Sequence, residues 1–135
     1  MPMMEWNESY SVHVVAFDKE HKELFKYFNE FYDAMMHDKG STVVGDVLAK
    51  TCNYAVTHFR AEEAWMEKNK YPELAQHREE HRKFAEQATK LLKDAQSGRI
   101  VLSGSVSKML REWLTNHIMG SDKKYAEFAI AHKIV

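Results

Sequence analysis

The sequence lacks the features that mark several common classes of protein. It has one cysteine, Cys52, which excludes a disulfide within the chain and fits a reducing compartment. Lysine and arginine together number 19, against 20 aspartate and glutamate residues, and the two signs are interleaved along the chain. We therefore expect neither a nucleic-acid partner nor an anionic membrane surface as a partner, because both require concentrated positive charge.

The sequence also has no continuous apolar run of about 18 residues, so we expect no insertion into a membrane. Its beginning, MPMMEWNESY, contains neither the basic segment nor the apolar segment of a signal peptide. A cytoplasmic location is the expectation that follows.

Helix-breaking residues are few, with five glycines and two prolines in 135 residues. Apolar residues recur three or four positions apart, as at Leu24, Phe28, Phe31 and Met35, which is the period of one buried helix face. The pattern predicts an all-α fold, an antiparallel up-down-up-down four-helix bundle. The expected single domain, 1–135, consists of an N-terminal arm (1–17), helices at about 18–38, 41–68, 72–96 and 103–120, and a short helical C-terminal extension (121–135). Asp18 is the expected N-cap of the first helix, and Pro72 is expected in the first turn of the third.

The short turns between the expected helices place several histidines at one height in the bundle. His21 lies about 18 residues before the first turn and His58 about 18 after it, so each is roughly 27 Å from that turn along its helix axis. The third turn relates His81 and His117 in the same way. The sequence thus predicts one layer of five histidines and two acids: His21, His58, Glu62, His77, His81, His117 and Asp122.

These side chains are expected to face the core, where a buried polar group without a partner costs several kcal/mol and a bound metal removes that cost. One spacing is irregular, because His117 and Asp122 are five residues apart and a regular α-helix would separate them by about 140°. We expect either a π-type widening of the helix or a helix end at MGSD followed by an inward turn. Gly120 makes either distortion inexpensive.

Seven donors exceed the four that one zinc ion prefers, whereas two metal ions that share two carboxylates fit the number, and mixed imidazole and carboxylate ligands suit iron. HFRAE at 58–62, HREEH at 77–81, HIMGSD at 117–122 and His21 within FDKEHKELF together resemble the hemerythrin signature. The resemblance extends over nearly the whole chain, from WNESYSV onward. The chain looks like a single-domain bacterial hemerythrin.

The resemblance implies a cofactor of two iron ions joined by an oxo or hydroxo bridge, with dioxygen as ligand. The implied ligands are His77, His81 and His117 for one iron, His21 and His58 for the other, and Glu62 and Asp122 as bridges. The second iron would keep one position open for dioxygen. The implied O2 pocket is formed by apolar neighbours of the ligands: Leu24, Phe59, Trp113, Leu114, Ile118 and Met119.

The implied function is reversible, non-enzymatic binding of dioxygen for storage, transport or delivery. A diiron oxidase, peroxidase or nitric-oxide-handling enzyme on the same scaffold is one alternative, and an oxygen or redox sensor read by a partner is another. The small number of carboxylates weakens the first alternative, and the lack of an attached signalling domain weakens the second. We expect dioxygen as the ligand, an O2-consuming enzyme as its recipient, and a monomeric chain.

Other polar residues carry weaker expectations. His13, His37 and His132 are expected to bind no metal, and His37 and His132 are expected to contact solvent. His13 stands where hemerythrins usually have a small residue, and it is expected to alter the packing of the N-terminal arm over the site. Glu20 precedes a ligand and is expected to tune its surroundings. Glu63 and Trp65 are expected to take no part in the chemistry.

Overall fold

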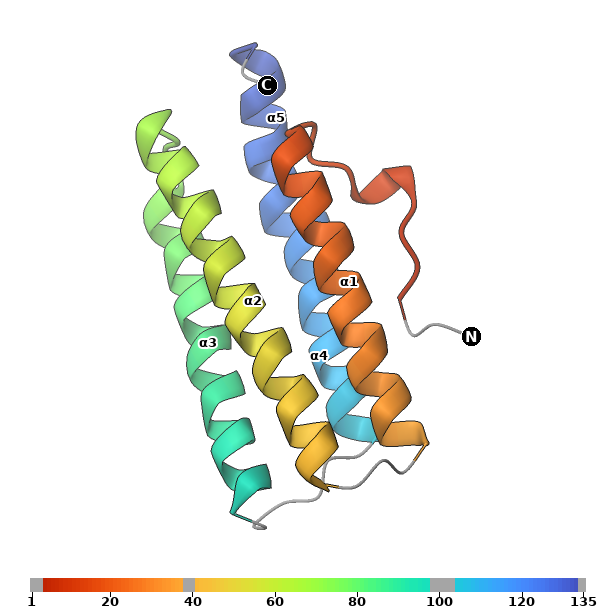
Figure 1. Cartoon of the computed structure of the whole chain (residues 1–135). Helices are drawn as coiled ribbons and strands as arrows, with labels where there is room; N and C mark the ends of the chain where they lie inside the picture. The colour runs from red at the N-terminus through yellow and green to blue at the C-terminus, as the bar shows by residue number, and fades with distance from the viewer. Residues whose placement is uncertain (1–3, 38–40, 98–103, 134–135) are drawn as a thin grey trace.

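The computed structural model describes residues 4–37, 41–97 and 104–133. Its main helices are α1 (Val15–Met36), α2 (Ser41–Lys68), α3 (Leu74–Gln96) and α4 (Gly104–His117). α4 continues through a π-helical turn, η2 (Ile118–Asp122), into α5 (Lys123–Ala131), and a short 3-10 turn, η1 (Glu8–Tyr10), interrupts the N-terminal arm. Successive helices lie antiparallel (Figure 1), which confirms the all-α four-helix bundle. The expected helix limits at 38 and 103 and the last two residues of the C-terminal extension lie outside the described residues.

The first helix begins at Val15, earlier than the predicted N-cap Asp18. Asp18 instead lies in the first turn, where its carboxylate accepts the backbone N–H of Val12 (2.8 Å) and the hydroxyl of Ser11 (2.6 Å). An acid is favourable there because the first turn of a helix carries free N–H groups and the positive end of the dipole. Asp18 therefore does not cap α1; it holds the N-terminal arm against the first turn of that helix.

The third helix begins at Leu74, later than predicted, because Pro72 belongs to the turn before it. Lys70 adopts a left-handed conformation (φ 56°), and its N–H bonds to the carbonyl of Glu67 (3.2 Å). The N–H of Tyr71 reaches back to the carbonyl of Met66 (2.8 Å). This pair of bonds is a Schellman motif, which satisfies the last carbonyls of α2 and turns the chain toward α3.

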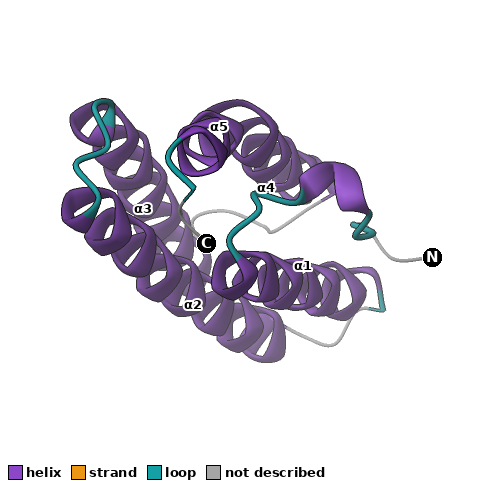
Figure 2. Ribbon diagram, turned by 90° about the horizontal axis from the view of Figure 1, so that it is seen from above, coloured by secondary structure: helices purple, strands orange, loops and turns teal. Residues whose placement is uncertain are grey.

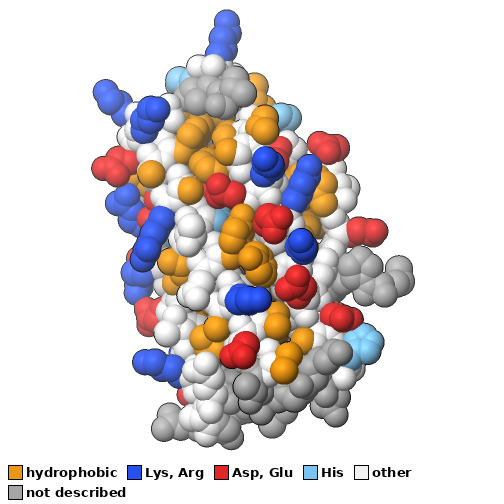
Figure 3. Space-filling model, viewed as in Figure 1, with side chains coloured by type: hydrophobic (Ala, Val, Ile, Leu, Met, Phe, Trp, Pro, Cys, Tyr) orange, Lys and Arg blue, Asp and Glu red, His pale blue; other side chains and the backbone are white. Residues whose placement is uncertain are grey.

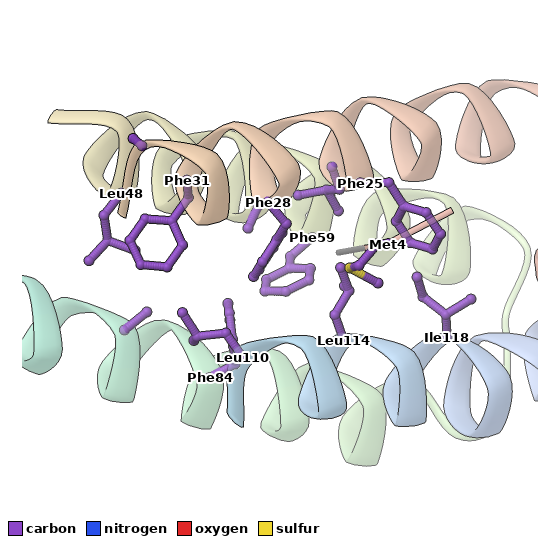
Figure 4. Close-up of a cluster of buried hydrophobic side chains, with 14 of the residues drawn as sticks. Met4, Phe25, Phe28, Phe31, Leu48, Phe59, Phe84, Leu110, Leu114 and Ile118 are labelled. Carbon is purple, nitrogen blue, oxygen red and sulfur yellow. The ribbon is translucent and has the colours of Figure 1, made fainter. Parts of the chain in front are cut away.

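Two clusters of buried apolar side chains divide the bundle along its length. The large cluster, part of which Figure 4 shows, includes Phe25, Phe28, Phe31, Leu48, Phe59, Phe84, Leu110, Leu114 and Ile118. The small cluster consists of Val12, Val14, Phe17, Met66, Tyr71, Tyr125, Ala126 and Ala129. Along α2, Phe59 belongs to the large cluster and Met66 to the small one, with buried Glu62 between them. A buried polar layer therefore separates the two apolar clusters.

The N-terminal arm lies on the side of the bundle between α1 and α4 (Figure 2). The Met4 backbone and the Asn29 amide exchange two hydrogen bonds (2.7 and 2.8 Å), and Trp6 and Tyr10 pack on Phe25 with ring centroids 5.7 and 5.0 Å away. At its other end, Lys123 donates to the carbonyl of Ser11 (2.7 Å). The arm thus joins α1 to the beginning of α5.

On the face drawn in Figure 3, acidic and basic side chains are mixed, and the apolar atoms occur in small groups between them. This distribution agrees with the interleaved charges of the sequence. Among the described residues, no helix combines the length and the apolar character needed to cross a bilayer.

Candidate metal centre

The seven predicted donors lie together between the two apolar clusters, and each comes from the element expected to carry it. α1 contributes His21, α2 contributes His58 and Glu62, α3 contributes His77 and His81, and the end of α4 with η2 contributes His117 and Asp122. All seven side chains are buried, none with more than 4% of its surface exposed. The bundle therefore places five imidazoles and two carboxylates out of contact with solvent.

The π-helical turn brings the last two donors together. Across η2, the N–H of Lys123 reaches the carbonyl of Ile118, an i to i+5 bond. This widening brings Asp122 onto the same side as His117, with 3.1 Å between His117 Nε2 and Asp122 Oδ1. Of the two distortions expected from the sequence, the widened helix is confirmed. A Cβ on Gly120 would meet no atom within 4 Å, so this glycine eases the backbone change without being needed to make room.

Each carboxylate turns its two oxygens toward different histidines. Glu62 Oε2 lies 3.3 Å from His21 Nε2 and 3.2 Å from His58 Nε2, whereas Oε1 lies 3.3 Å from His81 Nε2. Asp122 behaves in the same way: Oδ2 lies 3.2 Å from His21 Nε2, and Oδ1 lies 2.9 Å from His77 Nε2. The donors thus form two neighbouring groups. Glu62 belongs to both, and Asp122 belongs to the group of His77, His81 and His117, from which its Oδ2 reaches His21.

Most of these atoms are close to one another without being hydrogen-bonded. Within the described part of the chain, the buried side-chain atoms that have no hydrogen-bond partner include both nitrogens of His21, Nε2 of His77, Oε1 of Glu62 and both oxygens of Asp122. Buried polar atoms are nearly always satisfied in native proteins. Nitrogen and oxygen lone pairs that face one another without pairing are what donors around shared cations require, so the residues fit a pair of metal ions.

Protonation of the layer also depends on the two carboxylates. Burial alone lowers the pKa of an imidazole. Glu62, Glu20 and Asp122 together outweigh burial and, without metal ions, raise the pKa of His58 to about 10, and Asp122 and Glu62 raise that of His77 to about 9. The same balance, with Glu80 contributing, raises the pKa of His117 to about 10. The histidines in turn hold the pKa of Glu62 well below its ordinary value despite burial. Any metal ion must therefore displace protons from this site.

Three further carboxylates hold the outer nitrogens of the histidines. Glu20 lies 2.6 Å from His58 Nδ1, which agrees with the influence expected of it. Glu63 lies 2.9 Å from His81 Nδ1, a contact that the sequence did not predict. Carboxylates at this place fix the ring so that Nε2 presents its lone pair inward.

The third outer carboxylate is Glu80, 3.2 Å from His117 Nδ1, and the hydroxyl of Ser121 donates to both of its oxygens (2.6 and 2.8 Å). On the inner side, buried Tyr125 donates its hydroxyl to Glu62 Oε2. Sequence reasoning missed these three residues and Glu63. Glu63 and Glu80 each adjoin a predicted ligand and Tyr125 follows Asp122 by three residues, but this spacing alone does not show which way their side chains face.

Apolar rings cover the histidines on the side of the large cluster. Phe59 stacks on His81 with ring centroids 3.9 Å apart, and half-buried Trp113 stacks on His117 at 4.6 Å. The remaining buried members of the predicted pocket are Leu24, Leu114 and Ile118. Met119 is 43% exposed, so the structure does not bring it to the pocket, because the widened turn leaves its side chain on the outer surface.

The other histidines lie away from the layer. His37 and His132 are exposed, as expected, and His37 pairs with Asp33 (3.0 Å); His13 is exposed as well. Trp65 packs against Phe17 and Tyr125 in contact with the small cluster.

The hemerythrin HHE cation binding domain matches the chain over residues 12–129, a range that contains all seven donors. The chain belongs to the hemerythrin family. A bacteriohemerythrin of Methylococcus capsulatus is 31% identical, with 93% of this chain and 95% of the relative covered. A myohemerythrin of Theromyzon tessulatum is 33% identical over 90% of this chain and 89% of its own length.

The fold is also that of solved hemerythrins. A crystal structure of a wild-type hemerythrin superposes with a TM-score of 0.88 at 29% identity, covering 93% of this chain and 96% of the other. The buried donors of this hemerythrin chain therefore lie in a bundle whose helices are arranged as in its structurally characterised relative.

Proposed function

We propose that this hemerythrin binds dioxygen reversibly at a pair of iron ions and serves to store or deliver it. The observation that carries the proposal is the buried layer of five imidazoles and two shared carboxylates, six of whose atoms lack hydrogen-bond partners among the described residues. Mixed imidazole and carboxylate donors suit iron, and family membership agrees with a cation site.

The donors divide between two positions. His77, His81 and His117 would hold one ion at a three-histidine position, and His21 and His58 would hold the other at a two-histidine position. Glu62 and Asp122 would contribute carboxylate oxygens to both. The two-histidine position has fewer protein donors, which leaves room for a small ligand in the coordination sphere of its ion. When bound, the iron pair supplies the electrons that dioxygen takes up and gives back.

The protein's own contribution is to keep the donors fixed and the site dry. Glu20, Glu63 and Glu80 hold three imidazoles by their outer nitrogens, so each Nε2 lone pair stays directed inward. Phe59 and Leu114 are buried beside the histidines and keep water, with the protons it carries, out of the site.

The arrangement favours a carrier over an oxidase. Among the side chains that the structure describes, the buried acids are Glu62 and Asp122, and both are used as bridges. The site thus offers no additional buried carboxylic acid to protonate and cleave an O–O bond. We also propose that the chain acts as a cytoplasmic monomer that supplies an O2-consuming enzyme, in agreement with its mixed surface charges and single cysteine.

Repeated oxygenation tests this function. The iron-loaded protein is reduced without oxygen, exposed to air and deoxygenated through several cycles while its visible spectrum is recorded. Charge-transfer bands that form and vanish reversibly are the expected result. Irreversible bleaching with consumption of an added reductant would instead identify an oxidase, and binding of one zinc ion in place of iron would exclude the proposed centre.

A further inference from the structure

The two positions of the centre do not offer equal sets of donors. One atom from each of His77, His81, His117, Glu62 and Asp122 lies within 4.8 Å of all the others, so the three-histidine position is complete in the folded chain. At the two-histidine position, the described residues that meet the same condition are His21, His58 and Glu62. A cation at the second position therefore gains fewer contacts from the protein, or requires Asp122 to adjust.

The support behind the histidines is also unequal. At the three-histidine position, His81 is held by Glu63, which Arg78 holds in turn (3.0 Å), and His117 is held by Glu80. Loss of such outer partners commonly lowers metal affinity by roughly 10- to 100-fold.

At the two-histidine position, Glu20 supports His58, but Nδ1 of fully buried His21 has no hydrogen-bond partner in the described part of the chain. No hydrogen bond on the outer nitrogen therefore fixes the orientation of the His21 ring. An imidazole without a partner on its outer nitrogen is a weaker donor and is less fixed in direction.

Tyr125 adds a third, independent difference. Its hydroxyl donates to Glu62 Oε2, the oxygen that faces His21 and His58, and Oε1 on the other side receives no such bond. A lone pair shared with a phenol is less available to a cation. The hydrogen bond therefore weakens the bridge at the two-histidine position and leaves its other end free.

We propose that the two positions fill in a fixed order, the three-histidine position first, and that Tyr125 sets the difference in affinity through Glu62 Oε2. The inference rests on the proposed two-metal centre. The protein passes through a form with one divalent transition-metal ion, and when metal is scarce it loses the ion of the two-histidine position first. Oxygen binding is then lost before the bundle loses the other ion.

Titration of the metal-free protein with Co²⁺, followed by visible absorption and by calorimetry, tests this order without any measurement of oxygen binding. We expect two resolved steps, with the first at least roughly tenfold tighter than the second. His21→Gln should abolish the second step and keep the first, with helicity checked by circular dichroism.

Tyr125→Phe is the decisive variant, because it removes one hydroxyl and keeps the ring. It should strengthen the second step severalfold and leave the first unchanged. Tyr71→Phe is the matched control, since Tyr71 is a buried tyrosine of the same cluster whose hydroxyl lies near Glu73 (3.3 Å), and it should alter neither step.

Two equal or cooperative steps in the native protein would overturn the inference, and so would a weaker second step in Tyr125→Phe. Both outcomes leave the oxygen-binding proposal standing. A native protein that takes up no Co²⁺ would remove both proposals together.

Discussion

The large and the small apolar cluster hold the two ends of one bundle in different ways. The large cluster is built from rings and aliphatic side chains of all four main helices, as at Phe28, Phe84 and Leu110. The small cluster is assembled from the arm, the beginning of α1, the end of α2 with the turn after it, and α5. Its largest central side chain, Tyr125, is hydrogen-bonded to Glu62 in the histidine layer. The large cluster therefore meets the histidine layer through stacked rings such as Phe59 on His81, whereas the small cluster is also hydrogen-bonded to one of its carboxylates.

Removal of both metal ions should have the largest effect and should separate the two ends. Each ion present at about a thousand times its Kd stabilises the fold by about 4 kcal/mol, so loss of both should cost about 8 kcal/mol and lower the Tm strongly. Hydrogen exchange measured on the metal-free protein should rise more in α5 and in the arm than around Phe28 and Phe31. An equal rise at both ends would contradict the distinction between the clusters.

A pair of phenylalanine truncations sharpens the comparison. Phe28→Ala in the large cluster and Phe17→Ala in the small one should each lower the free energy of unfolding by about 3–5 kcal/mol, because both side chains are almost fully buried. The two should differ in metal binding. Phe17 contacts His58 and Tyr125, each with ring centroids 6.0 Å away, so its loss should also weaken metal affinity severalfold.

Chemical denaturation and Co²⁺ titration of the same two variants measure both effects. Phe28→Ala is the control, since its large stability loss should leave metal affinity nearly unchanged. Equal losses of metal affinity in the two variants would show that the affinity depends on the overall stability of the fold and not on the packing of the small cluster.

The pH dependence of metal binding tests the layer itself. Without metal ions, the carboxylates raise the pKa of His58 and His117 to about 10 and that of His77 to about 9 against the lowering effect of burial, so these groups carry protons at pH 7. Each metal ion must displace at least one proton, and apparent affinity should rise roughly tenfold per displaced proton for each pH unit below 9. The stability of the metal-free fold should change with pH in the opposite direction. The protonated histidines stabilise it fully below pH 6.5, and this stabilisation is lost as pH rises through 9 to 10. Calorimetry in buffers of different ionisation enthalpy counts the protons, and affinity independent of pH between 6 and 8 would contradict the prediction.

The bundle and its seven donors could be predicted from the sequence because both follow from spacing. Period and turn position fix which residues share a height, and donors four residues apart, such as His58 and Glu62, share a helix face. The irregular spacing of His117 and Asp122 even predicted a distortion, with the π-helical turn as one of two forms.

What the sequence could not supply was contact across helices. Glu63 adjoins Glu62 and is expected from the sequence to take no part in the chemistry, yet its carboxylate reaches His81 on α3. Whether an acid one position from a ligand faces solvent or a neighbouring imidazole depends on how the helices are rotated against each other, which helix periodicity does not determine. The same rotation, together with the widened turn, leaves Met119 outside the pocket.

The smallest predicted effect concerns the arm that closes the small cluster. His13 has φ 61°, a left-handed conformation that strains any residue with a Cβ, while its neighbours Val12 and Val14 are buried. His13→Gly should relieve this strain. Glycine also has greater conformational entropy in the unfolded chain, which offsets part of the gain, so the net stabilisation should be about 0.5 kcal/mol. His13→Ala, which removes the imidazole and keeps the Cβ, is the control and should give no gain. Denaturation midpoints measure both variants, and equal stabilisation by alanine would show that the imidazole, and not the backbone, carries the cost.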